Sequence, residues 1–600
     1  MPFGAEVRGD GSVRFRLWAP KATRVELSLV GPQKLLLLNR LDEGWFELIT
    51  REAKPGTHYR FRIDEKNEVP DPASRFQPLD VNGPSEVINP QRFEWRDDKW
   101  HGRPWYAAVI YELHVGAFTS LGTFRAAEEK LSHLSDLGIT AIELMPVADF
   151  AGRRNWGYDG VLPFAPDSSY GHPDELKHLV QSAHEHGLMI FLDVVYNHFG
   201  PEGNYLRLYS PEFFTSRHST PWGDAINFDG SGSRVVRDFF IHNALYWLEE
   251  YRFDGLRLDA VHEIADDSKP DILTELAETV RAQLGNQREI HLMLENADNA
   301  AHYLARDDQL RVTHYDAQWN DDIHHALHVL VTGESDGYYR DFTHNPIQHL
   351  CRCLTQGFAY QGGYSAFHGA KRGEPSTSLP LTAFISFLQN HDQIGNRASG
   401  ERIVQLTQPE GVRAAMEILL LAPAPPLLFM GEEFGATSPF LYFCDFQGDL
   451  ASAVTNGRRK EFARFARFSS GVMRDQIPDP NSEQTFLKSK LNWDCLSDQP
   501  QKEWLRLYRE LLSLRHRVIV PHLRANSTSE ILSSDEKKRT FAIRWSFSDG
   551  LELHLRANLG REPVALEDVR GTRVYHTRTA ESQLKEKRLP NWSVVWSIVQ

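Results

Sequence analysis

The sequence of 600 residues has only four cysteines and no apolar run long enough to cross a membrane. Four cysteines in a chain of this length do not form a disulfide framework. A membrane helix needs about 18 or more apolar residues. The longest candidate, residues 418–429, is interrupted by Pro423, Pro425 and Pro426. The N-terminus also lacks the basic start and apolar stretch of a signal peptide. These absences predict a cytoplasmic protein.

The chain also has no excess of positive charge, since its formal net charge is −15 at pH 7. Nucleic acids and anionic membranes select basic surfaces, so neither is an expected partner. Cys351 and Cys353 are two positions apart, and no second cysteine pair stands near them to complete a zinc site. Aromatic residues, by contrast, are frequent, with 14 Trp and 19 Tyr. Their rings pack in protein cores and also against the C–H faces of sugars.

Changes in the hydrophobic period divide the chain into three parts. Residues 1–95 alternate apolar and polar side chains in short runs, as at 13–18, which predicts an N-terminal β-sandwich. Residues 96–490 alternate between strand-like and helix-like patterns. Residues 491–600 return to period two. One expected strand precedes a Ser-Asp-Gly turn and one follows it, a pattern typical of a hairpin. We therefore expect a C-terminal β-sandwich.

The middle part has the rhythm of a parallel sheet covered by helices. Its first elements are expected at residues 109–114 (strand), 123–137 (helix, ended by Gly138), 139–144 (strand), 174–186 (helix) and 188–193 (strand). Strands that alternate with helices of this length indicate parallel pairing. The span exceeds the ~250 residues of a minimal (β/α)8 barrel but leaves room for insertions. The expected fold class is therefore α/β, with a (β/α)8 TIM barrel between two β-sandwich domains.

Four short segments each place an ionisable side chain at the end of an apolar run, namely 193–198, 255–259, 294–296 and 390–392. A barrel gathers strand ends that are far apart in sequence into one pocket. Because strand side chains alternate, Arg257 and Asp259 should face the same way, toward the barrel axis. An ion pair that serves only the fold is the alternative, but buried charge is costly and the strand end favours function. The arginine should keep Asp259 ionised.

These four segments resemble, in order and content, the signature regions of the α-amylase family of glycoside hydrolases. The resemblance implies a retaining α-glucan-processing enzyme, with Asp259 as nucleophile, Glu295 as general acid/base and Asp392 as third carboxylate. Such an enzyme places its two reacting carboxyl groups about 5–5.5 Å apart. The acid must remain protonated near neutral pH, so burial and nearby carboxylates should raise its pKa. Leu294 departs from the small residue common before the glutamate, and Asp298 is the rival carboxylate.

The resemblance also implies the residues around the reacting centre. Asp193 and Asn197 are expected to support the loop and Arg257. The residues expected to bind substrate are Trp156, Tyr158, His198, Arg257, His262 and His391. For His198 a structural role is the alternative. No metal or cofactor is expected. His324 and His328 stand at i, i+4 and could form a ligand pair, but glycoside hydrolysis needs no metal and a packing or rim role is favoured.

Further sequence segments narrow the resemblance to the trehalohydrolase branch of that family. They lie at residues 319–325, 389–397, 429–434, 439–443 and 457–462. This branch hydrolyses the α-1,4 bond between a maltooligosaccharide and a terminal trehalose. The nearest relatives, the branching enzymes, usually have Gly-Asn-Glu where Gly431-Glu-Glu433 stands, and a different run where Ala260-Val-His262-Glu263 follows the nucleophile. His262 would face the acceptor side.

The resemblance implies maltooligosyl trehalose as substrate and the synthase that makes it as pathway partner, and we expect a monomer. Two other functions remain open. A branching or debranching enzyme would share the barrel and the carboxylates and differ at the acceptor subsites. An inactive glucan-binding protein would use the same domains only to hold polysaccharide. The intact set Asp259, Glu295 and Asp392 argues against the second, since binding alone does not require all three.

Overall fold

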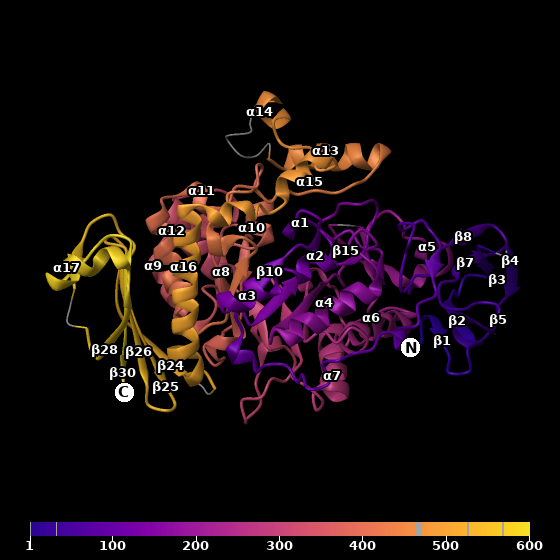
Figure 1. Cartoon of the computed structure of the whole chain (residues 1–600), viewed down its shortest axis with the longest axis horizontal. Helices are drawn as coiled ribbons and strands as arrows, with labels where there is room; N and C mark the ends of the chain where they lie inside the picture. The colour runs from indigo at the N-terminus through magenta and orange to yellow at the C-terminus, as the bar shows by residue number, and fades with distance from the viewer. Residues whose placement is uncertain (1, 32, 222, 463–470, 525–526, 567–568) are drawn as a thin grey trace.

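The computed structural model describes residues 2–31, 33–221, 223–462, 471–524, 527–566 and 569–600 (Figure 1). A small N-terminal β domain and a C-terminal β domain flank a central barrel on opposite sides. A group of helices projects from the barrel between them, namely α13 (Gly448–Phe462), α14 (Gly471–Asp475) and α15 (Glu483–Ser489). The three-part organisation expected from the hydrophobic period is therefore present in the molecule.

The N-terminal domain is a sandwich of two antiparallel sheets with the strand orders β1-β2-β6-β5 and β4-β3-β7-β8. These strands are β1 (Gly4–Val7), β2 (Val13–Trp18), β3 (Val25–Leu29), β4 (Lys34–Leu37), β5 (Asn39–Arg40), β6 (Trp45–Thr50), β7 (His58–Ile63) and β8 (Asn67–Val69). In β2 the apolar Val13, Phe15 and Leu17 are buried and the arginines between them are not, as period two requires. Phe3 packs on Phe239 of the barrel and joins the two domains.

Within the described residues, eight parallel strands close into the central barrel in sequence order. They are β10 (Ile110–Leu113), β11 (Ala141–Leu144), β14 (Met189–Val194), β17 (Gly255–Leu258), β18 (His291–Leu294), β19 (Ala317–Trp319), β22 (Phe384–Phe387) and β23 (Pro426–Phe429). Strand β10 pairs with both β11 and β23, so the sheet has no free edge. The expected TIM barrel is confirmed.

Helices cover the outside of this barrel. The longer ones are α4 (Pro173–Glu185), α6 (Ser233–Glu249), α7 (Ile272–Leu284), α8 (Asp321–Thr332), α9 (Pro346–Gln356), α12 (Pro409–Leu419) and α16 (Gln499–Leu514). The single helix expected at 123–137 is wrong, because α2 (Phe124–Glu128) and α3 (Leu131–Leu137) form instead. The two pieces pack on different partners, α2 on α4 and α3 on α16, so one straight helix could not serve both. Gly138 ends α3 in a left-handed conformation, as predicted.

The C-terminal domain is built on one five-stranded sheet with the order β24-β25-β26-β30-β28. The expected hairpin is present as β25 (Thr540–Phe547) and β26 (Glu552–Asn558), beside β24 (Ser527–Asp535), β28 (Thr572–His576) and β30 (Ser593–Val599). One face packs on α9 and α12, where the Trp545 indole N–H donates to the Leu354 carbonyl at 3.0 Å. The second layer of the expected sandwich is small, comprising β27 (Val564–Ala565), β29 (Arg588–Leu589) and α17 (Glu581–Lys585).

Helix α16 packs on α3 and on the short helix η9 (Glu432–Phe434) that follows the last barrel strand. This helix therefore completes the ring around the barrel, although it lies within residues 491–600. We propose that the boundary with the C-terminal β domain falls between α16 and β24 rather than at residue 491. The physical reason is that the apolar face of α16 is covered by barrel helices, not by the terminal sheet.

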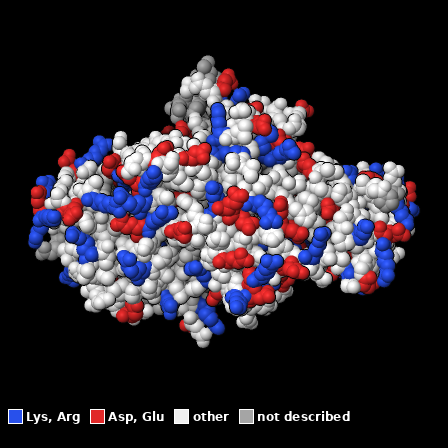
Figure 2. Space-filling model, in the orientation of Figure 1, with Lys and Arg blue, Asp and Glu red and all other residues white. Residues whose placement is uncertain are grey.

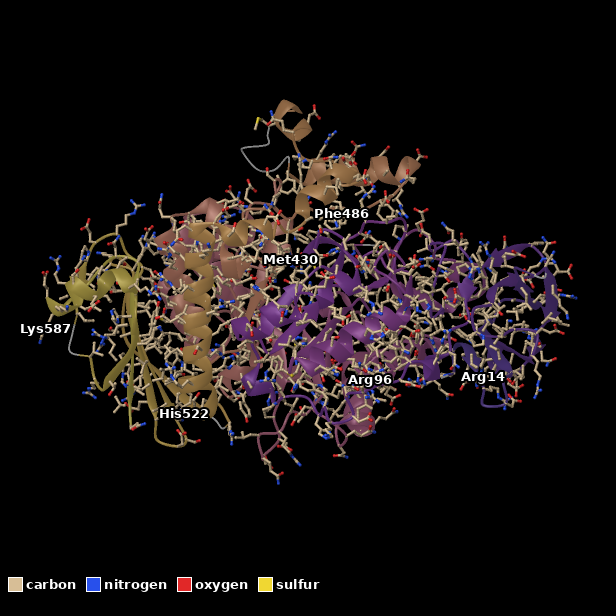
Figure 3. All side chains as sticks on the ribbon, viewed as in Figure 1. Arg14, Arg96, Met430, Phe486, His522 and Lys587 are labelled. Atoms are coloured by element: carbon tan, nitrogen blue, oxygen red, sulfur yellow. The ribbon has the colours of Figure 1, made fainter. Side chains whose placement is uncertain are left out.

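Insertions surround the carboxyl ends of the barrel strands. A hairpin of β15 (Phe214–Thr220) and β16 (Gly223–Ile226) follows β14, and a second hairpin of β20 (Gly363–Ser365) and β21 (Ala370–Arg372) precedes β22. Phe486 of α15 packs edge-to-face on Phe443, with ring centroids 5.0 Å apart (Figure 3). The projecting helices are thereby fixed to the barrel.

On the face shown in Figure 2, basic and acidic side chains are interspersed over all three domains. Although the net charge of the whole chain is −15, charges of both signs are mixed on this side of the molecule. Among the described residues, no helix combines the length and apolar character needed to cross a bilayer.

Candidate active site

Three carboxylates from three neighbouring barrel strands meet on one buried arginine. Arg257 of β17 is fully buried, and its guanidinium donates to Asp193 at 2.5 Å, Asp259 at 2.9 Å and Glu295 at 2.6 Å. The guanidinium also lies over the Trp319 ring, 4.0 Å from its centroid. Burial works against the charge of Arg257, but the surrounding carboxylates outweigh it and raise the pKa. The expected common orientation of Arg257 and Asp259 is confirmed.

Asp259 stands at the carboxyl end of β17, and only 12% of its side chain is exposed. The Asn197 amide donates to Asp259 Oδ2 and to the Asp259 carbonyl, both at 3.1 Å. Burial raises the pKa of Asp259 above its ordinary value, and Arg257 offsets that shift only in part. The arginine therefore acts in the expected direction, yet it does not determine the ionisation of Asp259 alone.

Glu295 follows β18 directly and lies next to the loop that begins at Asp259. Its Oε2 accepts from Arg257 and from the Ala260 backbone N–H at 3.0 Å. Ala260 has φ +39°, a left-handed conformation that is unfavourable for a residue other than glycine. Strained backbone of this kind is typical of functional sites, and here it directs an N–H toward the carboxylate. The rival Asp298 lies exposed on the surface.

Asp392 and His391 begin the short helix α10 (His391–Gly395), whose first turn is capped by Asn390. His391 Nδ1 is bonded to Glu112 Oε1 at 2.5 Å, and its Nε2 lies 3.5 Å from Asp392 Oδ1. Burial opposes the imidazolium, but Asp392 and Glu112 outweigh it and raise the pKa of His391 to about 9. Burial raises the pKa of Asp392, and the charge of His391 reduces that shift. Glu112, on β10, was not predicted from the sequence.

Aromatic and imidazole rings form the wall beside these carboxylates. The Tyr158 hydroxyl donates to Asp193 Oδ2 at 2.7 Å, and its ring stacks on His391 with centroids 5.1 Å apart. His198 Nε2 is bonded to the Tyr158 carbonyl at 2.9 Å. Trp156 is buried, stacks on Phe440 and donates to the Leu441 carbonyl at 2.9 Å. The wall is therefore held in place by contacts within the protein.

Two cavities open beside the carboxylates, and Glu295 and Asp392 line both of them. The larger, of about 700 Å³, is also lined by Tyr158, His198, Asp259, His391, Tyr442 and Arg458. The smaller, of about 190 Å³, is also lined by Ala297, Asp321, His325, Tyr338, Phe367 and His368. The two cavities therefore adjoin at Glu295 and Asp392.

His262 is on the short helix η5 (Val261–Glu263), three residues after Asp259. Its Nδ1 accepts from the backbone N–H of Ala297, which lines the smaller cavity, at 3.2 Å. His262 is also close enough to His368 of the same cavity for their charges to interact. The structure therefore places His262 at the edge of the smaller cavity.

Comparison with known proteins follows the same division of the chain. Family models match residues 2–77 as carbohydrate-binding module 48 (isoamylase N-terminal domain), 87–219 as an alpha amylase catalytic domain, and 534–596 as a domain of unknown function, DUF3459. The malto-oligosyltrehalose trehalohydrolase of Deinococcus radiodurans is 42% identical, covering 94% of this chain and 90% of its own. That of Saccharolobus solfataricus is 40% identical, covering 86% and 87%.

The chain belongs to the malto-oligosyltrehalose trehalohydrolase family, within the α-amylase group of glycoside hydrolases. A solved structure from Salmonella typhimurium, whose name assigns it to the alpha amylases, matches with a TM-score of 0.94 and 44% identity, covering 100% of this chain and 99% of that one. The whole architecture, including both β domains, is thus shared and not only the barrel.

Sequence reasoning missed several residues of the site. Glu112 holds His391, Trp319 supports Arg257, and Tyr442 and Arg458 line the larger cavity. Glu112 and Trp319 had a signal, because each lies in or at the end of a barrel strand. Tyr442 and Arg458 come from the long insertion after β23 and lie in segments 439–443 and 457–462, which indicated the branch of the family but did not assign these side chains to the site.

The histidines weighed as a metal pair are used in packing. His324 is buried and bonded to the Leu388 carbonyl at 2.6 Å, and His328 stacks on Tyr339 with centroids 4.1 Å apart. Over the described ranges, the group whose spacing could hold a metal ion is His218, Asp229 and Asp267. The guanidinium of Arg217 lies 3.3 Å from Asp229 and 3.1 Å from Asp267, so both carboxylates already form ion pairs.

Proposed function

We propose that this protein hydrolyses the α-1,4-glucosidic bond next to the terminal trehalose of maltooligosyl trehalose. The products are free trehalose and a maltooligosaccharide. The observation that carries the proposal is the meeting of Asp259 and Glu295 on the buried Arg257, with a cavity on either side. Membership of the trehalohydrolase family supports the choice of substrate.

The proposed chemistry proceeds in two steps with retention of configuration. First, the Asp259 carboxylate attacks the anomeric carbon while Glu295 protonates the glycosidic oxygen, so that trehalose leaves. Second, Glu295 takes a proton from water, which displaces Asp259 from the sugar. Both recorded hydrogen bonds of Glu295 go to Oε2. Oε1 is therefore the oxygen assigned to proton transfer.

The supporting residues have roles in the same scheme. Asp392 and His391 bind hydroxyl groups of the sugar ring whose glycosidic bond is cleaved. Trp156, Tyr158 and His198 form the wall around this ring. Arg257, held by Asp193, keeps the reacting carboxylates in register. Asn197 orients Asp259 through its amide. These assignments follow from which side chains line the larger cavity and which lie behind them.

The two cavities suggest how the substrate lies. The larger one suits the maltooligosaccharide chain, and the smaller one, bordered by His262, suits the terminal disaccharide. Trehalose is α,α-1,1-linked and turns away from the helical path of an α-1,4 chain. A pocket complementary to that turn in the transition state would gain less from maltose, and each ~1.4 kcal/mol forfeited costs about tenfold in rate.

The test compares two substrates of equal length. Maltooligosyl trehalose should release free trehalose and a maltooligosaccharide shorter by one disaccharide, whereas a plain maltooligosaccharide should react far more slowly. Amylose should gain no α-1,6 branches. Chromatography that finds equal rates on both substrates, or new branch points in amylose, would support a branching or debranching enzyme instead.

The setting of the reaction belongs to the same proposal. Maltooligosyl trehalose is made by a synthase, which would act before this enzyme in trehalose biosynthesis. We place both in the cytoplasm and expect the present protein to act as a monomer. Size-exclusion chromatography with light scattering tests the last point, since a dimer would elute with twice the mass of one chain.

A further inference from the structure

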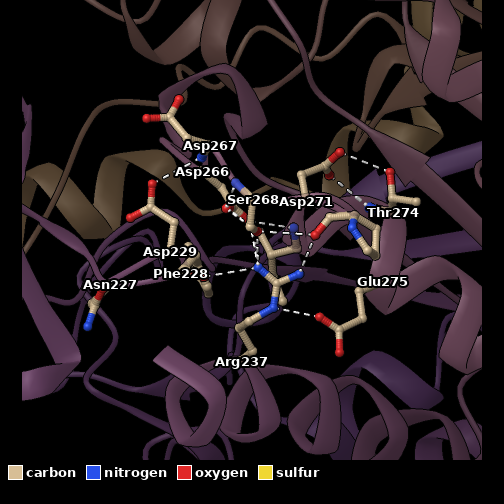
Figure 4. Close-up of polar contacts among 12 residues, drawn as sticks. Asn227, Phe228, Asp229, Arg237, Asp266, Asp267, Ser268, Asp271, Thr274 and Glu275 are labelled. Carbon is tan, nitrogen blue, oxygen red and sulfur yellow. Dashed lines mark hydrogen bonds and ion pairs between the residues drawn. The ribbon is translucent and has the colours of Figure 1, made fainter. Parts of the chain in front are cut away.

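A second buried arginine lies behind the nucleophile loop. Arg237 of α6 is 5% exposed, and its guanidinium donates hydrogen bonds to five acceptors (Figure 4). They are Glu275 Oε2 at 2.5 Å, Asp266 Oδ2 at 2.7 Å, Ser268 Oγ at 2.8 Å, the Pro270 carbonyl at 2.9 Å and the Phe228 carbonyl at 3.0 Å. Three of the five belong to residues 266–270, so Arg237 chiefly holds one loop.

That loop joins β17 to α7 and carries groups of the active site at its other end. Asp259 begins it, Ala260 donates to Glu295, and His262 accepts from Ala297 at the smaller cavity. The held end has internal bonds of its own, because Asp266 Oδ2 also accepts from the Ile272 N–H at 2.6 Å. The loop is thus fixed at both ends, by the strand on one side and by Arg237 on the other.

We propose that Arg237 is a positioning residue for recognition of the trehalose end of the substrate. It acts through residues 266–270, which fix where the loop places His262 and the Ala260 N–H. The inference rests on the proposed function, since it assigns the smaller cavity to trehalose. A misplacement of about 1 Å at a reacting group can cost about 100-fold in rate, so a remote clamp can control selectivity.

Only an arginine suits this place. The guanidinium presents five N–H donors in a rigid fork, whereas a lysine ammonium is a single point with three. The five acceptors come from three segments, namely Phe228 before α6, residues 266–270 of the loop, and Glu275 of α7. A lysine could satisfy the Asp266 carboxylate but would release Ser268 or Pro270.

Helix α6 offers a matched control three residues earlier. Arg234 also bonds Glu275, at 2.6 Å, and pairs with Asp238, but its side chain is 55% exposed. Its recorded partners lie on α6 and α7, not on residues 266–270. Arg234→Ala therefore removes an arginine–Glu275 pair on the same helix and leaves the loop contacts in place.

The experiment measures kcat and KM on maltooligosyl trehalose and on a plain maltooligosaccharide of equal length. Arg237→Lys and Ser268→Ala are compared with wild type and with Arg234→Ala. For Arg237→Lys, kcat/KM on maltooligosyl trehalose should fall by about 10- to 100-fold, and by much less on the plain chain. Ser268→Ala removes one of the three contacts of Arg237 with the loop, together with the hydrogen bonds of the Ser268 hydroxyl to Asp266 and to the Pro270 carbonyl. It should shift the ratio the same way, by about 2- to 10-fold. Arg234→Ala should leave the ratio unchanged.

The outcomes separate cleanly. If both substrates lose rate equally in Arg237→Lys and Ser268→Ala, the arginine has only a structural role and the inference is overturned. If Arg237→Lys does not fold, as judged by circular dichroism, Ser268→Ala decides on the same ratio. If wild type itself shows no preference for maltooligosyl trehalose, the proposed function fails, which is a different result from an unchanged ratio in the variants.

Discussion

Replacing Glu112 by Gln should lower the pKa of His391 and weaken sugar binding at alkaline pH. In the structure Glu112 Oε1 is bonded to His391 Nδ1 at 2.5 Å, and Glu112 Oε2 accepts from the His391 N–H at 3.1 Å. Glutamine keeps the size and one acceptor oxygen but removes the charge. The imidazolium would then be held by Asp392 alone, against the burial that disfavours it.

The magnitude follows from the pKa. His391 has a pKa of about 9 instead of 6.5, and that difference corresponds to about 3 kcal/mol of favourable interaction with the charged form. Asp392 and Glu112 share it, so loss of the Glu112 charge should forfeit about 1 to 2 kcal/mol, or a lowering of the pKa by about 1. Because the folded pKa is raised, this stabilisation is complete below pH 6.5 and is lost as pH rises through about 9.

The assay titrates binding rather than turnover, so that the pH dependence of the proposed reaction does not interfere. In a Glu295→Gln background, oligosaccharide affinity is measured by calorimetry between pH 6 and 10. In that background the affinity should fall above about pH 9. When Glu112→Gln is added, the fall should begin about one pH unit lower. Direct NMR titration of the His391 ring should give the same two midpoints.

Glu143 provides the control. It is the register partner of Glu112 on the adjacent strand β11 and is fully buried. Burial and the neighbouring Glu112 carboxylate raise the pKa of Glu143 well above its ordinary value and so disfavour its charged form. Glu143→Gln keeps the size of the side chain and should move the His391 titration much less than Glu112→Gln. An unmoved midpoint in Glu112→Gln, or an equal shift in Glu143→Gln, would refute the reasoning.

Three further predictions concern the reacting centre. Asp259→Asn and Glu295→Gln should each lower turnover by several orders of magnitude with oligosaccharide binding retained, as measured by kinetics and calorimetry; near-normal turnover would contradict the assignment. Proton NMR in the first seconds should show the α-anomer of the released maltooligosaccharide, and exhaustive chelation should not change the rate, whereas a β-anomer or loss of activity would exclude this mechanism. Arg257→Lys should reduce kcat/KM by about 100-fold or more, because one ammonium cannot hold three carboxylates in register; wild-type kinetics would show that the guanidinium fork is not needed.

The sequence was sufficient for the features that depend on local periodicity. Alternation in Val13–Trp18 predicted a half-buried strand, and the alternation of strand and helix predicted the barrel. Arg257 and Asp259 could be placed on one side of β17 because side chains two positions apart share a face. The ends of parallel strands meet at one rim, so the convergence of Asp193, Asp259 and Glu295 also followed from the sequence.

The tertiary structure alone decided how distant segments meet. Glu112 and His391 are separated by 279 positions, and their contact exists only because barrel closure places β10 near the end of β22. The break between α2 and α3 depends on their separate packing partners, α4 and α16. Helix propensity is a local property and does not predict such packing. The two cavities arise where insertions after different strands pack over the same rim.

Arg237 belongs to this second group as well. Arg234 and Arg237 stand one turn apart on α6, yet Arg237 is buried against a loop and Arg234 is exposed. Local sequence fixes the direction in which a side chain leaves its own helix or strand. What that side chain meets there depends on packing between elements, and on the desolvation and charge that packing creates.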